Sequence, residues 1–225
     1  MPSRTYKAVL FDLDNTLADR DSAIIAVARA LHAWRPEIAA EVSADDFIPL
    51  FVEMDNNGQA SRDLLMRRVL ERWTAIPVDQ PAMLSWYASV YGPSFPYDSS
   101  VIEFLNSLTR GSIPWGIITN GSAQQHETTE ALGIESICPC FSISEEMGSK
   151  TIGHTIFSKT LECLGLEVSS GVIFVGDDPV ADIEIAQTLG LSTAWIRRQR
   201  PWADPYYEPD YQIDHVSELA PLFGL

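Results

Sequence analysis

The sequence predicts an α/β protein with a Rossmann-like, doubly wound parallel sheet and an inserted α-helical domain. Short apolar runs alternate with segments of helical periodicity through most of the chain, which is the pattern of a parallel sheet covered by helices on both faces. One long stretch near the N-terminus breaks this alternation, because it has helical spacing and no convincing strand. At 225 residues, the chain has room for a core domain and one inserted accessory domain.

The predicted strands are apolar runs that end in polar residues. The first covers residues 7–11 and stops at Asp12, as expected of a buried parallel strand with carboxylates at its end. Further strands are predicted at 113–119, 171–176, 192–196 and 211–213. Helices are predicted between them at 99–110, 122–133, 154–165 and 180–189, with a short one from Ser217.

The insertion follows the first strand. Four segments in it have helical spacing, at 22–34, 44–54, 61–75 and 80–90. Asn56-Asn57-Gly58 is a turn signal, and Ser61 is a suitable N-cap for the helix after it. We therefore predict a core domain from residues 1–17 and 96–225 and a helical domain from residues 18–95.

Charge and hydropathy narrow the possible partners. The formal net charge of −16 disfavours nucleic acid and anionic membrane surfaces as partners. A small anionic substrate stays compatible, because a bound cation or a helix N-terminus can reverse the field locally. No segment has about 18 uninterrupted apolar residues, and Asp12 interrupts the first apolar run, so a cytoplasmic location is expected.

The three cysteines do not form an even set. Cys138 and Cys140 flank one proline, which is one residue short of the usual redox or zinc spacing. We therefore expect these cysteines to be small buried residues near a strand, with no redox or zinc role.

Polar residues follow the first two predicted strands. Asp12 and Asp14 come after the first, and two charges at the end of a buried strand are costly without a cation. Thr119-Asn120-Gly121 follows the second, where a hydroxyl and backbone N–H groups at a helix start can hold phosphate oxygens.

A third polar cluster follows the strand at 171–176. Asp177, Asp178 and Asp182 supply carboxylates, the ligands that suit Mg²⁺. Asp178 precedes Pro179 and is expected to cap a helix. For Asp182, support of a metal site and simple compensation of the helix dipole both stay open.

These blocks, in this order, resemble the haloacid dehalogenase superfamily. The resemblance runs from Phe11-Asp12-Leu13-Asp14-Asn15-Thr16-Leu17 through Gly116-Ile117-Ile118-Thr119-Asn120-Gly121 to Val175-Gly176-Asp177-Asp178. The helical insertion resembles the family's cap. Each motif is weak by itself, whereas their joint occurrence over nearly the whole chain is specific.

The resemblance implies a role for each matching residue. Asp12 would be the nucleophile that forms an aspartyl-phosphate, and Asp14 would transfer protons to the leaving group and from water. Asp12, the Asp14 carbonyl and Asp177 would bind Mg²⁺, while Thr119 and the Asn120 amide would hold the phosphoryl group. Chemistry of this kind depends mainly on positioning and charge neutralisation.

Three further positions are less clear. Asp182 would support the metal's waters or a basic residue, and Thr16 is either a phosphate contact or a local hydrogen-bonding residue. The family's lysine is expected at Thr151, but the chain has Lys150 one residue earlier and lacks the usual proline. Either Lys150 reaches the site as catalytic and phosphate-binding cation, or the cation is missing and turnover is weak.

The resemblance favours a phosphatase. Metal-free dehalogenases of this superfamily typically lack the second aspartate of the first motif, which is present here as Asp14. The expected substrate is a small phosphorylated metabolite, such as a nucleotide or a sugar phosphate, and the expected assembly is a monomer or homodimer. A phosphomutase, or a phosphate-binding or interaction protein with weak or lost turnover, remains an alternative.

Overall fold

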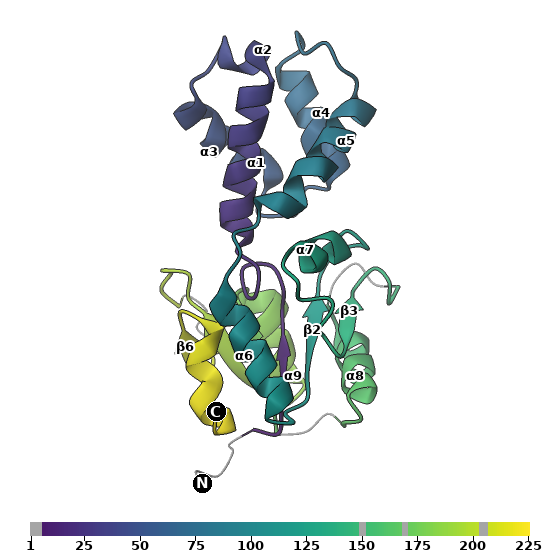
Figure 1. Cartoon of the computed structure of the whole chain (residues 1–225), viewed down its shortest axis with the longest axis vertical. Coiled ribbons are helices and arrows are strands. Elements are labelled where there is room, and N and C mark those ends of the chain that lie inside the picture. Colours follow the sequence, from purple (N-terminus) through teal and green to yellow (C-terminus); the bar gives the residue numbers. More distant parts are fainter. Residues whose placement is uncertain (1–5, 149–151, 168–170, 203–206) are drawn as a thin grey trace. The chain divides into compact units, whose positions relative to one another are not determined.

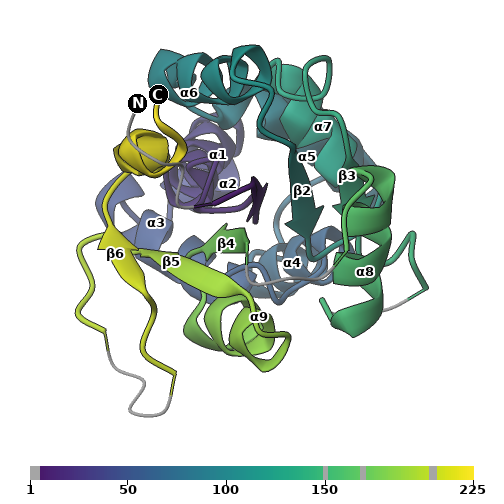
Figure 2. The ribbon, with the colours of Figure 1, turned by 90° about the horizontal axis from the view of Figure 1, so that it is seen from below.

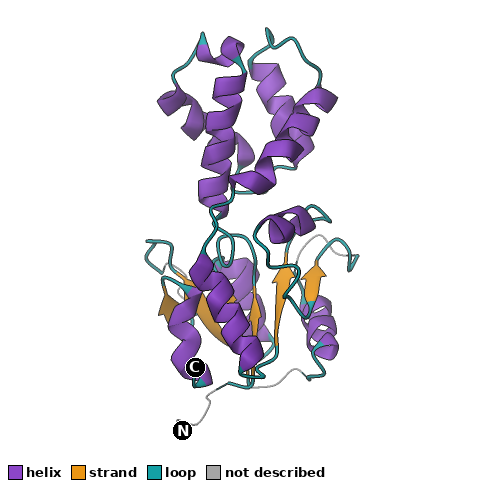
Figure 3. Cartoon of the chain, viewed as in Figure 1, coloured by secondary structure: helices purple, strands orange, loops and turns teal. Residues whose placement is uncertain are grey.

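The computed structural model describes residues 6–148, 152–167, 171–202 and 207–225. The chain divides into two compact units, Met1–Asp19 with Tyr97–Leu225, and Arg20–Pro96. Every strand of the described chain belongs to the first unit, and the second is built from helices (Figures 1 and 3). Within the described ranges, none of the helices combines the length and apolarity that crossing a bilayer requires.

One sheet of parallel strands organises the first unit, in the order β3-β2-β1-β4-β5-β6. Its strands are β1 (Ala8–Phe11), β2 (Trp115–Thr119), β3 (Phe141–Ile143), β4 (Val172–Gly176), β5 (Ser192–Ile196) and β6 (Tyr211–Ile213). Val9 pairs with Trp115 on one side and with Ile173 on the other, so β1 lies between β2 and β4. The predicted parallel α/β fold is confirmed, and the carboxyl ends of these three strands meet at one edge.

Helices cover both faces of this sheet, as Figure 2 shows in a view from below. One face carries α6 (Ser99–Arg110) and the 3₁₀-helix η3 (Val216–Phe223), and the other carries α8 (His154–Cys163) and α9 (Ile185–Thr188). Alternation along β1 explains this arrangement. Leu10 belongs to the apolar cluster with α8 and α9, whereas the Phe11 ring packs edge-on against Phe104 of α6.

Several elements differ from their predictions. β3 was not predicted, and α7 (Gln125–Ala131) is shorter than the helix expected at 122–133. The helix expected at 180–189 begins as the π-helical turn η2 (Pro179–Glu184) before α9. The wide turn arises because the N–H groups of Asp182 and Ile183 both point at the Asp178 carbonyl oxygen, at 3.1 and 3.3 Å.

The second unit contains α1 (Arg20–Trp34), α2 (Pro36–Ala39), α3 (Ala44–Asp55), α4 (Arg62–Arg72), α5 (Gln80–Tyr91) and the 3₁₀ turn η1 (Gly92–Ser94). Ser61 accepts a hydrogen bond from the Leu64 amide and caps α4, as predicted. Arg20 and Asp55 form a two-pronged ion pair inside this unit, with N–O distances of 3.0 and 2.8 Å. The Gly58 amide donates to the same Asp55 carboxylate, so this buried acid is well compensated.

Two of the cysteines form a disulfide that the sequence did not predict. Cys140 forms a disulfide with Cys163, which joins the start of β3 to the end of α8. Cys140 is buried as expected, but Cys163 is exposed and Cys138 is half-buried. Cys138 keeps its thiol, and burial raises the pKa of that thiol to about 12. Sequence spacing gave no signal for this pairing, since bridged residues need only be close in the fold.

Candidate functional site

Three carboxylates converge where β1 and β4 end. Asp12 follows β1 directly, and its amide donates to the Val175 carbonyl of β4 at 2.8 Å. Asp177 follows β4, and Asp182 lies one turn further on in η2. One oxygen from each of the three side chains lies within 4.8 Å of the others. The sheet register thus brings together acids that are 165 and 170 positions from Asp12 along the chain.

Gly176 allows Asp182 to reach this cluster. A Cβ atom at position 176 would lie 2.2 Å from an oxygen of Asp182, which no side chain can accept. The same oxygen, Oδ2, accepts the Asp178 amide at 2.9 Å. Asp178 in turn caps η2 by accepting the amides of Val180 and Ala181, so its predicted capping role is confirmed.

The electrostatics of the three acids are unfavourable. Burial raises the pKa of Asp12 well above its usual range, and repulsion from Asp182, Asp177 and Asp14 raises it further. Burial is also the main cause of the raised pKa of Asp182. The pKa of Asp177 rises to about 6, again chiefly through burial. A hard divalent cation bound by these oxygens would remove the repulsion, and carboxylates at this spacing suit Mg²⁺.

Arg200 provides a positive charge that the sequence pattern did not predict. Its guanidinium donates to Oδ2 of Asp177 at 2.9 Å and to the Asp177 carbonyl oxygen at 2.9 Å. It also lies over the Trp195 ring, 5.7 Å from the ring centre. Arg200 belongs to a loop after β5 that no motif marks, so only the folded chain brings it to Asp177.

Asp14 lies on a tight turn beyond Asp12. The amides of Thr16, Leu17 and Ala18 all point at the Leu13 carbonyl oxygen, which folds the chain back on itself. Asn15 adopts a positive φ of 61°, a conformation that asparagine tolerates better than most residues. The Asp14 carboxylate accepts a hydrogen bond from the side chain of Gln125 at 2.9 Å.

Thr119 and Asn120 lie at the end of β2, the strand next to β1. The Thr119 hydroxyl is buried and donates to the Asn120 carbonyl oxygen at 3.2 Å. The Asn120 side chain accepts the Ile152 amide at 2.7 Å and so fixes the chain two residues after Lys150. Ser144 accepts the Gly121 amide at 3.1 Å, which ties the next loop to the same strand end.

For two of the predicted site residues, Lys150 and Thr16, the described part of the chain gives no hydrogen bond to the three carboxylates. Lys150 and the alternative position Thr151 lie outside the described residues. The Thr16 hydroxyl oxygen is buried and has no hydrogen-bond partner among the residues that the structure describes. It therefore makes no local hydrogen bond there, so the local hydrogen-bonding role expected for it as the alternative to a phosphate contact is not borne out.

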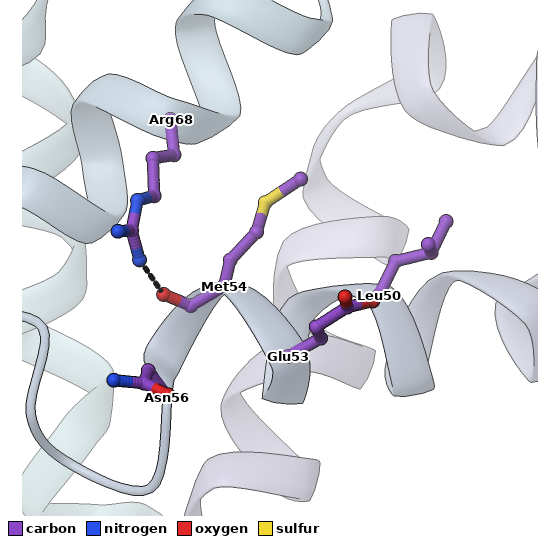
Figure 4. Close-up of a pocket in the computed structure, with 5 residues that line it drawn as sticks. All are labelled: Leu50, Glu53, Met54, Asn56 and Arg68. Atoms are coloured by element: carbon purple, nitrogen blue, oxygen red, sulfur yellow. Dashed lines mark hydrogen bonds between the residues drawn. The ribbon is translucent and has the colours of Figure 1, made fainter.

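The helical unit contains a cavity of its own. It measures about 530 Å³ and is lined by Leu50, Glu53, Met54, Asn56 and Arg68. Figure 4 shows the Arg68 guanidinium donating to the Met54 carbonyl oxygen, which occupies part of its hydrogen-bonding capacity. None of the residues predicted for chemistry lines this cavity.

Comparisons with known proteins agree with this geometry. A family model described as haloacid dehalogenase-like hydrolase matches residues 6–190. Pyrimidine 5'-nucleotidase YjjG of Escherichia coli is 28% identical, over 95% of this chain and 96% of that protein. Ribulose-1,5-bisphosphate 5-phosphatase of Halopiger xanaduensis is 30% identical, over 96% of this chain and 98% of the relative. Among solved structures, Bacillus subtilis YfnB bound to magnesium superposes with a TM-score of 0.76 at 20% identity, covering 98% of this chain and 99% of that one.

Proposed function

Because the chain belongs to the haloacid dehalogenase-like hydrolase family, we propose that it hydrolyses a small phosphate monoester through an aspartyl-phosphate on Asp12. The observation that carries the proposal is the cluster of Asp12, Asp177 and Asp182 at the strand ends, in which Asp12 and Asp182 are buried, with Asp14 on the adjoining turn. Two relatives are named for phosphatase activity on a nucleotide and on a sugar bisphosphate, which supports this substrate class.

Magnesium is the proposed cofactor. The Asp12 and Asp177 carboxylates and the Asp14 carbonyl oxygen would hold it, and Asp182 would orient the ligands from behind. The mutual repulsion of these buried acids supports a divalent cation, as does the magnesium bound by YfnB. When bound, the ion would supply positive charge against the phosphoryl oxygens.

The reaction would proceed in two displacements. A carboxylate oxygen of Asp12 attacks phosphorus while the bond to the ester oxygen breaks, and the Asp14 carboxyl group gives its proton to that leaving oxygen. Asp14, now a carboxylate, then takes a proton from a water molecule whose oxygen attacks the same phosphorus. The Asp12 carboxylate leaves, inorganic phosphate is released, and both side chains return to their starting protonation.

Thr119 and the Asn120 amide would bind the transferred phosphoryl group, with Thr16 as a further contact. Lys150 is the proposed catalytic and phosphate-binding cation. The Asn120–Ile152 hydrogen bond supports this role, because it anchors Ile152 to Asn120 at the end of β2, and Ile152 is two positions after Lys150 in the sequence. The helical unit, expected from the sequence at residues 18–95, would act as the cap that selects the substrate.

A binding protein of the same fold is the second candidate. The displacement of the lysine by one position relative to the family pattern favours it. Such a protein would bind Mg²⁺ and phosphate without turning over an ester, so the two candidates differ in product formation and not in metal affinity.

Phosphate release from p-nitrophenyl phosphate tests the proposed function. Wild type and Asp12→Asn are compared with Mg²⁺ and with EDTA, and Glu162→Gln serves as a control because Glu162 is an exposed acid on α8. We expect release that requires Mg²⁺, survives Glu162→Gln and is abolished by Asp12→Asn. Metal binding without release, repeated on a panel of nucleotides and sugar phosphates, would reject the phosphatase in favour of the binding protein.

A further inference from the structure

Gln125 joins the two strand ends that the proposed chemistry uses. It is the first residue of α7, and its side chain is buried. Its Nε2 atom lies 2.9 Å from Oδ2 of Asp14, 3.2 Å from Oγ1 of Thr119 and 3.0 Å from the Asn120 carbonyl oxygen. One amide group thus contacts the proton-transferring acid and the phosphate-binding end of β2.

The orientation of this amide follows from its neighbours. The Asn120 carbonyl oxygen can only accept hydrogen bonds, and the Thr119 hydroxyl gives its proton to that oxygen. Oδ2 of Asp14 accepts a hydrogen bond both in the carboxylate and in the acid that carries its proton on Oδ1. A flipped Gln125 would place its own oxygen against all of these acceptors, which is repulsive. The NH₂ group therefore faces Asp14, and donation to a carboxylate is the stronger kind of hydrogen bond.

The position of Gln125 is also fixed by packing. Gly121 has a positive φ of 125°, and a Cβ atom there would lie 3.3 Å from Cγ of Gln125. The backbone N–H of Gln125 donates to the Ser122 carbonyl oxygen at 3.0 Å, and the backbone carbonyl oxygen of Gln125 accepts the Thr129 hydroxyl at 3.2 Å. Both backbone groups of Gln125 are hydrogen-bonded, and its side chain packs against Gly121. Because the side chain is already ordered, it loses little conformational entropy when it orients Asp14.

We propose that Gln125 is a positioning residue that holds the Asp14 carboxyl group in the orientation from which it exchanges protons with the leaving group and with water. The assignment rests on the proposed phosphatase function. Gln125 itself touches neither substrate nor metal in this account, and it acts through Asp14. Its contacts with Thr119 and Asn120 keep the proton donor in register with the phosphoryl group.

Leaving groups of different basicity separate this role from a structural one. The p-nitrophenolate ion departs without a proton, whereas the alkoxide of glycerol 2-phosphate needs one from Asp14. Because kcat/KM reports the steps up to the first departure, an Asp14 defect lowers kcat/KM for the alkyl ester alone. The later attack of water needs Asp14 with either ester, so kcat falls for both wherever that step limits turnover.

The experiment compares Gln125→Leu with Gln124→Leu, which removes the same amide from the exposed neighbouring position. Asp14→Asn is the benchmark, and Gln125→Met is a second variant in case Gln125→Leu folds poorly. For Gln125→Leu we expect kcat/KM on glycerol 2-phosphate to fall by roughly 10–100-fold, and on p-nitrophenyl phosphate by less than about 3-fold. Gln124→Leu should match wild type on both esters.

The outcomes are distinct. An equal loss on both esters would assign Gln125 to phosphate binding or to the stability of α7, and would overturn the positioning role. Unchanged kinetics in a folded Gln125 variant would overturn it as well. Absence of release by wild type from either ester would instead reject the proposed phosphatase function, and the role of Gln125 with it.

Discussion

The two units of the chain each bury charged side chains, but they treat the charges differently. In the helical unit, Asp55 receives two hydrogen bonds from Arg20 and a third from the Gly58 amide. In the sheet unit, Asp12 lies among other carboxylates, and repulsion from them adds to the effect of burial on its pKa. The first acid is compensated by its own chain, whereas the second is compensated only in part.

The difference teaches how to separate a structural charge from a functional one. A buried ion pair with its hydrogen bonds satisfied contributes to a defined fold and needs nothing further. Buried acids that repel each other cost stability, and a chain retains such a cost where the site performs chemistry. On this ground, the same Asp→Asn change should have opposite effects on stability in the two units.

The largest effect on stability is expected from Asp55→Asn. It removes the carboxylate charge that pairs with the buried Arg20 guanidinium, which costs about 3–5 kcal/mol of unfolding free energy. Urea denaturation followed by circular dichroism measures the loss. Asp63→Asn, at an exposed acid in the first turn of α4, is the control and should cost less than about 1 kcal/mol.

Asp177 and Asp178 offer a matched pair of neighbours for the metal site. We expect Asp177→Asn to lower Mg²⁺-dependent phosphate release by about 100-fold or more, because it removes a proposed ligand. Asp178→Asn retains an oxygen that can cap η2 and should stay within about 3-fold of wild type. Equal losses in the two variants would show that the helix start matters more than the ligand.

Asp12→Asn should stabilise the chain in the absence of metal, by roughly 1–3 kcal/mol, the usual size of a single-substitution effect. The substitution removes a buried charge that its neighbours repel. Thermal unfolding in EDTA measures the gain. Saturating Mg²⁺ should reverse the order, since only wild type retains the full set of ligands. A destabilised Asp12→Asn in EDTA would contradict the account of uncompensated acids.

The pH dependence of stability in EDTA sharpens the same point. A carboxyl group whose pKa is raised by folding binds its proton more tightly in the native state. Its stabilising contribution is therefore complete at acid pH and is lost as pH rises through the folded pKa. Burial raises the pKa of Asp177 to about 6. The stability that Asp177 contributes should therefore be lost between about pH 4 and pH 6. Wild type should lose stability across this window relative to Asp177→Asn.

The smallest effect concerns Arg200. Its guanidinium contacts the Asp177 oxygen that we assign to the metal, so Arg200→Gln should tighten Mg²⁺ binding by about 3–10-fold in calorimetric titrations. Arg197→Gln is the control, because Arg197 pairs with the exposed Asp214. Weaker Mg²⁺ binding by Arg200→Gln would mean that the guanidinium orients Asp177 for the metal and does not compete with it.

Much of the sheet could be predicted because its strands are apolar runs with punctuated ends. β1, β4 and β5 lie within or at the bounds predicted for them. β3 escaped prediction because Phe141-Ser142-Ile143 is too short to show a period, and its pairing with β2 comes from tertiary contact. The disulfide between Cys140 and Cys163 escaped for a related reason, since 23 positions separate the two residues.

The residues of the candidate site also divide into those that the sequence could predict and those that it could not. Asp12, Thr119 and Asp177 each come at or directly after the end of a strand, so the strand pattern alone indicates that they share an edge. Gln125 and Arg200 belong to a helix start and a loop whose positions are set by the folded chain. Their contacts with Asp14 and Asp177 have no counterpart in sequence spacing.

Covalent trapping on Asp12 tests the central claim most directly. Wild type is mixed with p-nitrophenyl phosphate and Mg²⁺, quenched in acid within a turnover, digested and analysed by mass spectrometry. We predict a phosphoryl group on the peptide containing Asp12, absent with EDTA and absent in Asp12→Asn. Phosphate release by a wild-type enzyme that carries no phosphoryl group, or carries it on another residue, would contradict the account.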